Sequence, residues 1–198
     1  MARCITVYAD GNKLRSSDMA PSEQKGQKSF GLHDSRDILE KLRWELRNLF
    51  CRQRYDIAVC QYHAFNCAIT AWHATDWLWQ DISSSPELKT KLQEKIQKPL
   101  KTVEDFQSYV RVDCWALRLC HQIANGSKHF LVTRNPDSTI SAVISDGEGY
   151  DYGNPIIVEG DMHHLADKVF GEALLWFEAF LRDWNIFPEE PFVSMGDS

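Results

Sequence analysis

The sequence predicts a mainly α-helical protein: a bundle of four to five helices with a small antiparallel β-hairpin or sheet inserted before the last helix. Three observations predict this class. Apolar residues recur at helical spacing in long segments between residues 34 and 124. At about residues 128–159 the pattern changes to short runs rich in β-branched residues. Helical spacing then returns in residues 162–184, so the β segment is an insertion within the bundle.

The chain is expected to have three parts. Residues 1–33 form an N-terminal strand and mobile loop, residues 34–184 form the helical bundle, and residues 185–198 form a C-terminal tail punctuated by proline. The strand is predicted at residues 3–8, where RCITVY has a β-type composition.

The first helix is predicted to run to about Arg52, with Asp34 or Ser35 as its N-cap. Its leucines and isoleucine recur at helical spacing and are expected to face the core. The other face carries charges of both signs, among them Arg43 and Glu45, and is expected to be solvated.

The second helix is predicted at about residues 56–82. It is apolar on most sides, so it is expected to be the central helix of the bundle. A short third helix follows, with Ser85 as its N-cap and Pro86 at its first position, and Pro99 ends it.

A fourth, long helix is predicted from about Thr102 to Ala124. Thr102 followed by Asp105 resembles a helix cap. Asn125 and Gly126 are expected to close this helix, because glycine readily adopts the left-handed conformation that ends many helices.

Three runs then have the composition of strands separated by turns: HFLVTR, TISAVIS and PIIVEG. Two or three antiparallel strands are therefore expected. Asp161 is predicted to cap the last helix, from Met162 to Trp184.

Composition limits the classes of function. The chain has 198 residues, of which 43% are hydrophobic, and a formal net charge of −6. Such a chain can bury a core, and its charge argues against gripping extended duplex DNA. We expect a cytoplasmic protein, because the N-terminus lacks a secretory signal, no segment is apolar enough to span a membrane, and the six cysteines are interpreted as reduced thiols.

Two predicted helices carry rows of polar side chains among apolar ones, at the spacing of a helical stripe. One row comprises His63, Asn66, Thr70, His73 and Trp77. The other comprises Arg118, His121, Asn125 and His129. Buried polar groups need partners, so we expect the two rows to face inward and meet. They either stabilise the core or line a site.

One functional interpretation is a metal-independent ribonuclease. Arg118, His121 and Asn125 would bind phosphate and move a proton, with His73 as an orienting or proton-transfer partner, aided by Asp76 one helical turn away. The alternative is that these side chains stabilise the core, as most buried polar clusters do.

A second functional interpretation is a small-molecule site. Its pocket would be walled by tryptophans, with polar side chains from both rows. The candidate ligand-binding residues are Asn66, Trp72, Trp77, Trp115 and His129.

Metals and cofactors are not expected. Cys60, His63 and Cys67 share a helix face and could converge on zinc, but no Cys-x-x-Cys pair is present and buried thiols are the preferred interpretation. The sequence also lacks a glycine-rich phosphate loop, a nucleophile elbow, a dinucleotide fingerprint and a His-Glu-x-x-His motif.

The runs YHAFNCAITAWHATDWLW and LRLCHQIANGSKHFLVTR resemble a family of bacterial hypothetical proteins. The helical layout of that family is similar to HEPN domains, over about residues 34–184. This resemblance implies roles in RNA processing or antiviral defence, often in toxin–antitoxin loci, with dimers that form a composite active site. Catalytic members have a wider spacing of Arg and His on a late helix, whereas two residues separate Arg118 from His121 here. The resemblance therefore implies the fold without the nuclease residues.

The expected function is that of a non-catalytic interaction or ligand-sensing module, in a prokaryotic defence or toxin–antitoxin setting by resemblance. A protein partner or a second copy of the chain is the expected partner, and RNA is the partner under the ribonuclease interpretation. No membrane association is expected.

Overall fold

The computed structural model describes residues 30–52, 57–128, 137–144 and 154–187. The chain divides into two compact units, Met1–Leu32 and His33–Ser198. The helices and strands of the described residues belong to the second unit. The strand predicted at residues 3–8 and the first predicted β run, at residues 129–134, lie outside the described residues, as does most of the predicted tail.

The described part of the chain forms six helices and three strands, which confirms the predicted fold class. The helices are α1 (Ser35–Arg52), α2 (Ile57–Ser84), α3 (Pro86–Ile96), α4 (Val103–Asp113), α5 (Trp115–Lys128) and α6 (Ala166–Asp183). The strands are β1 (Ile140–Ile144), β2 (Pro155–Glu159) and β3 (Met162–Leu165). They form an antiparallel sheet in the order β1-β2-β3, placed before the last helix.

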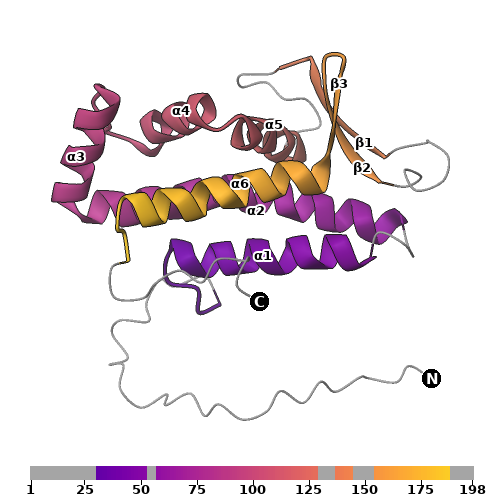
Figure 1. The fold of residues 1–198 in the computed structure, drawn as a ribbon, viewed down its shortest axis with the longest axis horizontal. Helices are drawn as coiled ribbons and strands as arrows, with labels where there is room; N and C mark the ends of the chain where they lie inside the picture. The colour runs from indigo at the N-terminus through magenta and orange to yellow at the C-terminus, as the bar shows by residue number, and fades with distance from the viewer. Residues whose placement is uncertain (1–29, 53–56, 129–136, 145–153, 188–198) are drawn as a thin grey trace, which may run out of the picture. The chain divides into compact units, whose positions relative to one another are not determined.

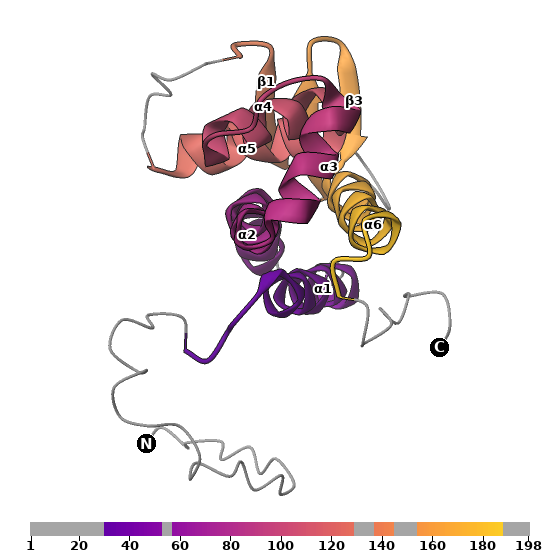
Figure 2. The same ribbon diagram turned by 90° about the vertical axis from the view of Figure 1, so that its left-hand side faces the viewer.

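The long helices pack in layers around α2 and α6, which lie side by side (Figures 1 and 2). Helix α1 covers one side of this pair, and α4 and α5 cover the other. Helix α3 crosses one end, and the sheet lies next to α5 at the other. Fully buried side chains fill the space between the layers: Leu42, Leu46, Leu78, Leu117 and Phe177. Helix α2 touches α1, α5 and α6, as its nearly continuous apolar surface predicts.

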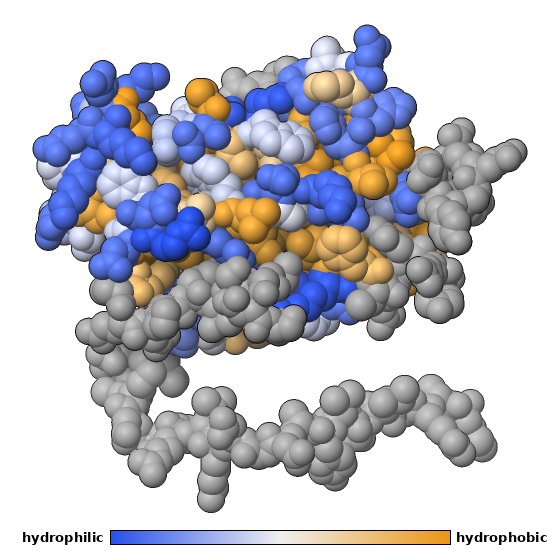
Figure 3. All heavy atoms as spheres, viewed as in Figure 1, coloured by the Kyte–Doolittle hydropathy of each residue, from blue (hydrophilic) through white to orange (hydrophobic). Residues whose placement is uncertain are grey.

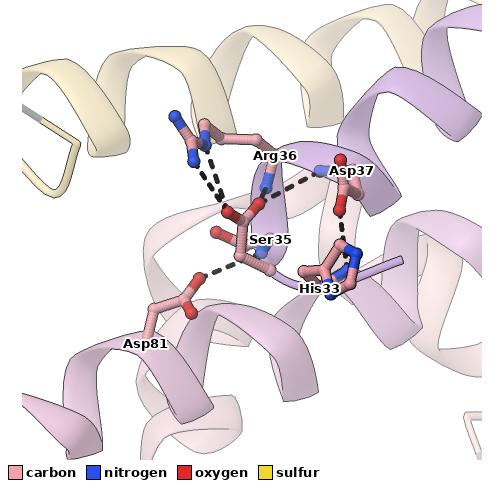
Figure 4. Close-up of polar contacts among 6 residues, drawn as sticks. His33, Ser35, Arg36, Asp37 and Asp81 are labelled. Atoms are coloured by element: carbon pink, nitrogen blue, oxygen red, sulfur yellow. Dashed lines mark hydrogen bonds and ion pairs between the residues drawn. The ribbon is translucent and has the colours of Figure 1, made fainter. Parts of the chain in front are cut away.

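The start of α1 is fixed by its N-cap and by α2 (Figure 4). An oxygen of Asp34 accepts hydrogen bonds from the backbone N–H groups of Arg36 and Asp37, at 2.9 and 3.3 Å. The backbone N–H of Ser35 donates to Asp81 of α2, at 3.0 Å. Three free N–H groups of the first turn are thus satisfied, as a helix start requires. Of the two candidate caps, Asp34 and Ser35, Asp34 is therefore the N-cap of α1.

The predicted caps of the next two helices are also confirmed. Ser85 is the N-cap of α3, where its hydroxyl accepts from the N–H of Leu88 at 3.4 Å, and Pro86 follows at the first position. Thr102 and Asp105 form a complete capping box at the start of α4.

The predicted long fourth helix is wrong in two respects. Its backbone becomes extended at Cys114 (φ −128°, ψ 105°), which separates α4 from α5. Helix α5 then continues through Asn125 and Gly126 to Lys128, so this pair does not close it. The break lets α4 and α5 follow different directions over α2 and α6 (Figure 1).

The predicted start of the last helix is also wrong. Gly160 and Asp161 form the tight turn between β2 and β3, and Gly160 has a positive φ of 57° that suits such a turn. Residues 162–165 pair with β2 instead of starting the helix, and α6 begins only at Ala166, without a side-chain cap. Asp161 therefore lies in the turn between two strands and caps no helix.

The outer face of α1 is less solvated than its charges predict. Arg43 and Glu45 are buried: Glu178 of α6 pairs with Arg43, and Lys41 of the same helix donates to Glu45 at 2.5 Å. None of the described helices is long and apolar enough to cross a membrane.

Candidate functional site

Two members of the α2 row, His63 and Thr70, contact α1, whereas His121 of the α5 row contacts a residue of α2 outside that row. On α2, Thr70 accepts a hydrogen bond from Lys41 of α1 at 2.5 Å. The ring of His63 lies edge-on to Trp44 of α1, with 6.3 Å between the ring centroids. These members of the α2 row therefore face α1, on the side of α2 away from α5.

The aromatic contact between α5 and α2 involves a residue of α2 that does not belong to the polar row. The ring of His121 lies edge-on to Trp72, with centroids 4.4 Å apart. Trp72 is buried, and it lies on a different face of α2 from the polar row. His121 therefore contributes to the packing between the two helices through its ring.

The surroundings of His121 disfavour a second proton on its ring. Nε2 lies 2.7 Å from Nδ2 of Asn125, one helical turn later. Nδ1 is buried and has no hydrogen-bond partner among the described residues. Burial, followed by the nearby positive charge of Arg111, lowers the pKa of His121 to about 4. The imidazole is therefore neutral near pH 7, and it cannot serve there as a protonated acid.

Arg118 belongs to a second group of contacts on the sheet side of α5. Its guanidinium forms an ion pair with Glu159 of β2, and Nη1 lies 3.8 Å from Oδ2 of Asp137. Two carboxylates thus offset its positive charge. The Arg118 side chain is 32% exposed, so it is only partly accessible to an anion.

Glu159 contacts both Arg118 and His164, and His164 belongs to none of the candidate sites predicted from the sequence. Oε2 of Glu159 lies 3.5 Å from Nε2 of His164 on β3, and the His164 ring lies 5.2 Å from the ring of Trp115. Residues 159 and 164 are diagonal neighbours on one face of the β2–β3 hairpin. The alternating pattern would have indicated this pair if residues 162–165 had been predicted as a strand.

Three of the proposed catalytic residues, Arg118, His121 and Asn125, therefore do not converge on one acid–base site. Arg118 and Asn125 lie on α5 with His121, but Arg118 contacts the sheet, whereas Asn125 contacts His121 and His121 packs against Trp72. His73 is half-buried on α2. Its neighbour Asp76 accepts a hydrogen bond from Gln107 of α4, at 2.8 Å. The geometry favours structural roles for this row.

The proposed ligand-binding residues also have different neighbours: Trp72 and Trp115 contact two different histidines. Trp72 packs against His121, whereas Trp115 is partly exposed against His164. Trp77 is half-buried and Asn66 is exposed on α2. His129 lies outside the described residues.

The described cysteines show no arrangement for metal binding. Cys60, Cys67, Cys114 and Cys120 are buried free thiols. Burial raises the pKa of Cys67 and Cys120, which keeps both protonated. Within the described ranges, no group of three or more His, Cys, Asp or Glu residues is placed to hold a metal ion.

Comparison with known proteins adds no assignment: no family model, curated protein or solved structure matches the chain.

Proposed function

We propose that this chain is a non-catalytic interaction module that associates with a second copy of itself through α1. The observation that carries this proposal is an exposed tryptophan at the centre of the outer face of that helix. Trp44 is 60% exposed although it is a large aromatic residue. Burying it against a partner would remove a large apolar surface from water.

A second exposed aromatic residue lies on α2, next in sequence to a residue that contacts Trp44. Tyr62 is 67% exposed and directly precedes His63, whose ring contacts Trp44. Trp and Tyr are enriched at protein interfaces and carry much of their binding energy.

The charges beside Trp44 favour a second copy as the partner. Glu40 precedes Trp44 by four residues and Arg47 follows it by three, so all three share the outer face of α1. Both charged residues are exposed. If two copies of α1 crossed antiparallel about a two-fold axis at Trp44, Glu40 of each copy would lie opposite Arg47 of the other.

The resemblance to HEPN bundles supports self-association, because that resemblance implies dimers. It also suggests a prokaryotic defence or toxin–antitoxin system as the cellular setting. The contacts of Arg118 and His121 support a non-catalytic role, because the first is paired with carboxylates and the second is buried against Trp72.

Sedimentation velocity of the full chain over a range of concentrations tests this proposal. We expect a monomer–dimer equilibrium with a dissociation constant on the order of 10 μM. Trp44→Ala should weaken the dimer by about tenfold or more, because it removes the central aromatic contact. Arg47→Glu should do the same by placing like charges opposite each other.

Arg182→Glu is the matched control for the charge reversal. Arg182 is exposed near the end of α6, where its side chain bonds the neighbouring Asp183. This variant should dimerise like the wild type. A wild-type chain that stays monomeric at about 100 μM would contradict the proposal, as would a dimer that Trp44→Ala and Arg47→Glu leave unchanged.

A further inference from the structure

A cavity of about 200 Å³ lies between the sheet and the helices α2, α5 and α6. Its walls include Phe65 of α2, Ile123 of α5, Val143 of β1, Ile157 of β2 and Phe170 of α6. On the face seen in Figure 3, apolar side chains (orange) also reach the surface next to the sheet. This sheet–helix cavity is separate from the contacts of Arg118 and His121.

The cavity runs from an exposed rim to a buried floor. At the rim, Phe65 is 44% exposed and Val143 is 47% exposed. At the floor, Ile157 and Phe170 are each 1% exposed. A molecule can therefore enter from solvent and reach the apolar core.

Small side chains leave this space open. Ala64 of α2, Ala142 of β1 and Ala166 of α6 all line the cavity, and each contributes a single methyl group. The apolar atoms around such a space lack contacts on one side, and a ligand that fills it would supply them.

The lining limits the chemistry of the ligand. Among the described residues that line the cavity, Gln61 is the one with a polar side chain, and none is ionisable. A charged group buried here would lose its hydration without gaining an ion pair. The ligand is therefore neutral, with room for at most one polar group near Gln61.

The volume limits its size. An engineered apolar cavity of about 150 Å³ is known to accept benzene. At about 200 Å³, the present cavity holds one aromatic ring with a small substituent or fused ring, or a short branched alkyl group. A larger ring system would leave part of its apolar surface outside the rim, or would displace the walls, which close-packed interiors resist.

From this size, lining and access we propose that the sheet–helix cavity is a binding site for a small, neutral, single-ring or branched-alkyl molecule. The proposal does not depend on self-association through α1, because Trp44 and Tyr62 do not line the cavity. It assigns the chain a ligand site in addition to its protein contact.

The test is an NMR titration of the full chain, following backbone amide shifts as indole or toluene is added. Benzoate serves as the charged probe of similar size. We expect indole to bind with a dissociation constant on the order of 0.1 mM and to shift the amides of Ala64, Ile123 and Ile157. Toluene should shift the same amides, and benzoate should bind at least about tenfold more weakly than indole.

Ala64→Leu tests the location of binding, because leucine is a good helix former and its side chain would fill the cavity. We expect the affinity for indole to fall by about tenfold or more while the melting temperature stays near that of the wild type. Ala64→Val is the smaller replacement, to be used if the leucine variant does not fold. Ala179→Leu is the matched control, since Ala179 is half-buried on α6 outside the cavity.

Three results would overturn the proposal. The first is the absence of saturable shifts at the cavity amides with indole and toluene. The second is binding of benzoate as tight as that of indole. The third is indole binding that a folded Ala64 variant leaves unchanged. Because the readout is local to the cavity, each result is distinct from a failure to dimerise.

Discussion

Arg43 of α1 and Glu178 of α6 form an ion pair in the interior of the bundle. The Nη2 and Nε atoms of Arg43 lie 2.7 and 3.2 Å from Oε1 of Glu178, and both residues are buried. Arg43 also pairs with the exposed Glu40 one turn earlier. This contact links the first and last helices, which are 135 residues apart at these positions.

We expect Glu178→Leu to lower the free energy of unfolding by about 3 kcal/mol, because it removes the interior carboxylate from a buried guanidinium. The double variant Arg43→Met, Glu178→Leu should be clearly more stable than this single variant, because a buried apolar pair avoids the desolvation of both charges. Urea unfolding of the wild type, both single variants and the double variant measures the coupling between the two residues. Additive losses in the double variant would show that the pair does not act as a unit.

His121 predicts a pH dependence of stability. Its pKa falls from 6.5 to about 4 on folding, chiefly through burial. Between these values the unfolded chain binds a proton that the folded chain does not, so stability falls as the pH is lowered from about 6.5 towards 4. One such group contributes a slope of at most about 1.4 kcal/mol per pH unit.

His121→Gln should reduce this slope when urea unfolding is repeated between pH 4 and 7. His163→Gln is the control, because His163 is exposed on β3. An equal slope in the wild type and His121→Gln would show that the buried imidazole is not its source.

The capping box of α4 gives a prediction about the fold. Thr102→Ala removes the hydroxyl that accepts from the N–H of Asp105, at 3.3 Å. The expected loss of stability is about 1 kcal/mol. Thr90→Ala is the control, because the Thr90 hydroxyl bonds a carbonyl within α3 and caps no helix end. A loss no larger than that of the control would rule out a stabilising role for this cap.

The parts of the fold that could be predicted are those governed by local residue chemistry. Ser85 and Thr102 cap helices as their side chains predict, because a cap needs only a few consecutive residues. The break at Cys114 could not be predicted, since no Pro or Gly is present there. Gly126 shows the reverse error: glycine is tolerated within a helix when surrounding contacts hold the chain, so it does not always end one.

The candidate site was harder to predict because it depends on partners from distant segments. The burial of Arg43 required Glu178 on the last helix, which no local pattern indicates. His63 and Thr70 of the α2 row both contact α1, and spacing does not reveal which neighbouring helix a face meets. His164 was missed because its segment was predicted as helix, where it would not lie beside Glu159.

Arg118 offers the most direct test of a non-catalytic role. Its guanidinium is held by Glu159 and Asp137, so Arg118→Met should lower the free energy of unfolding by about 1 kcal/mol, a modest value because the pair is partly exposed. Arg111→Met is the matched control, since Arg111 bonds Ser108 on its own helix. Both variants and the wild type are to be incubated with single-stranded and hairpin RNA in EDTA, and their melting temperatures recorded alongside.

We predict that none of the three proteins cleaves RNA and that Arg118→Met melts at a lower temperature than the other two. Cleavage by the wild type and by Arg111→Met that is lost in Arg118→Met, with no change in melting temperature, would contradict the account and make Arg118 a catalytic residue.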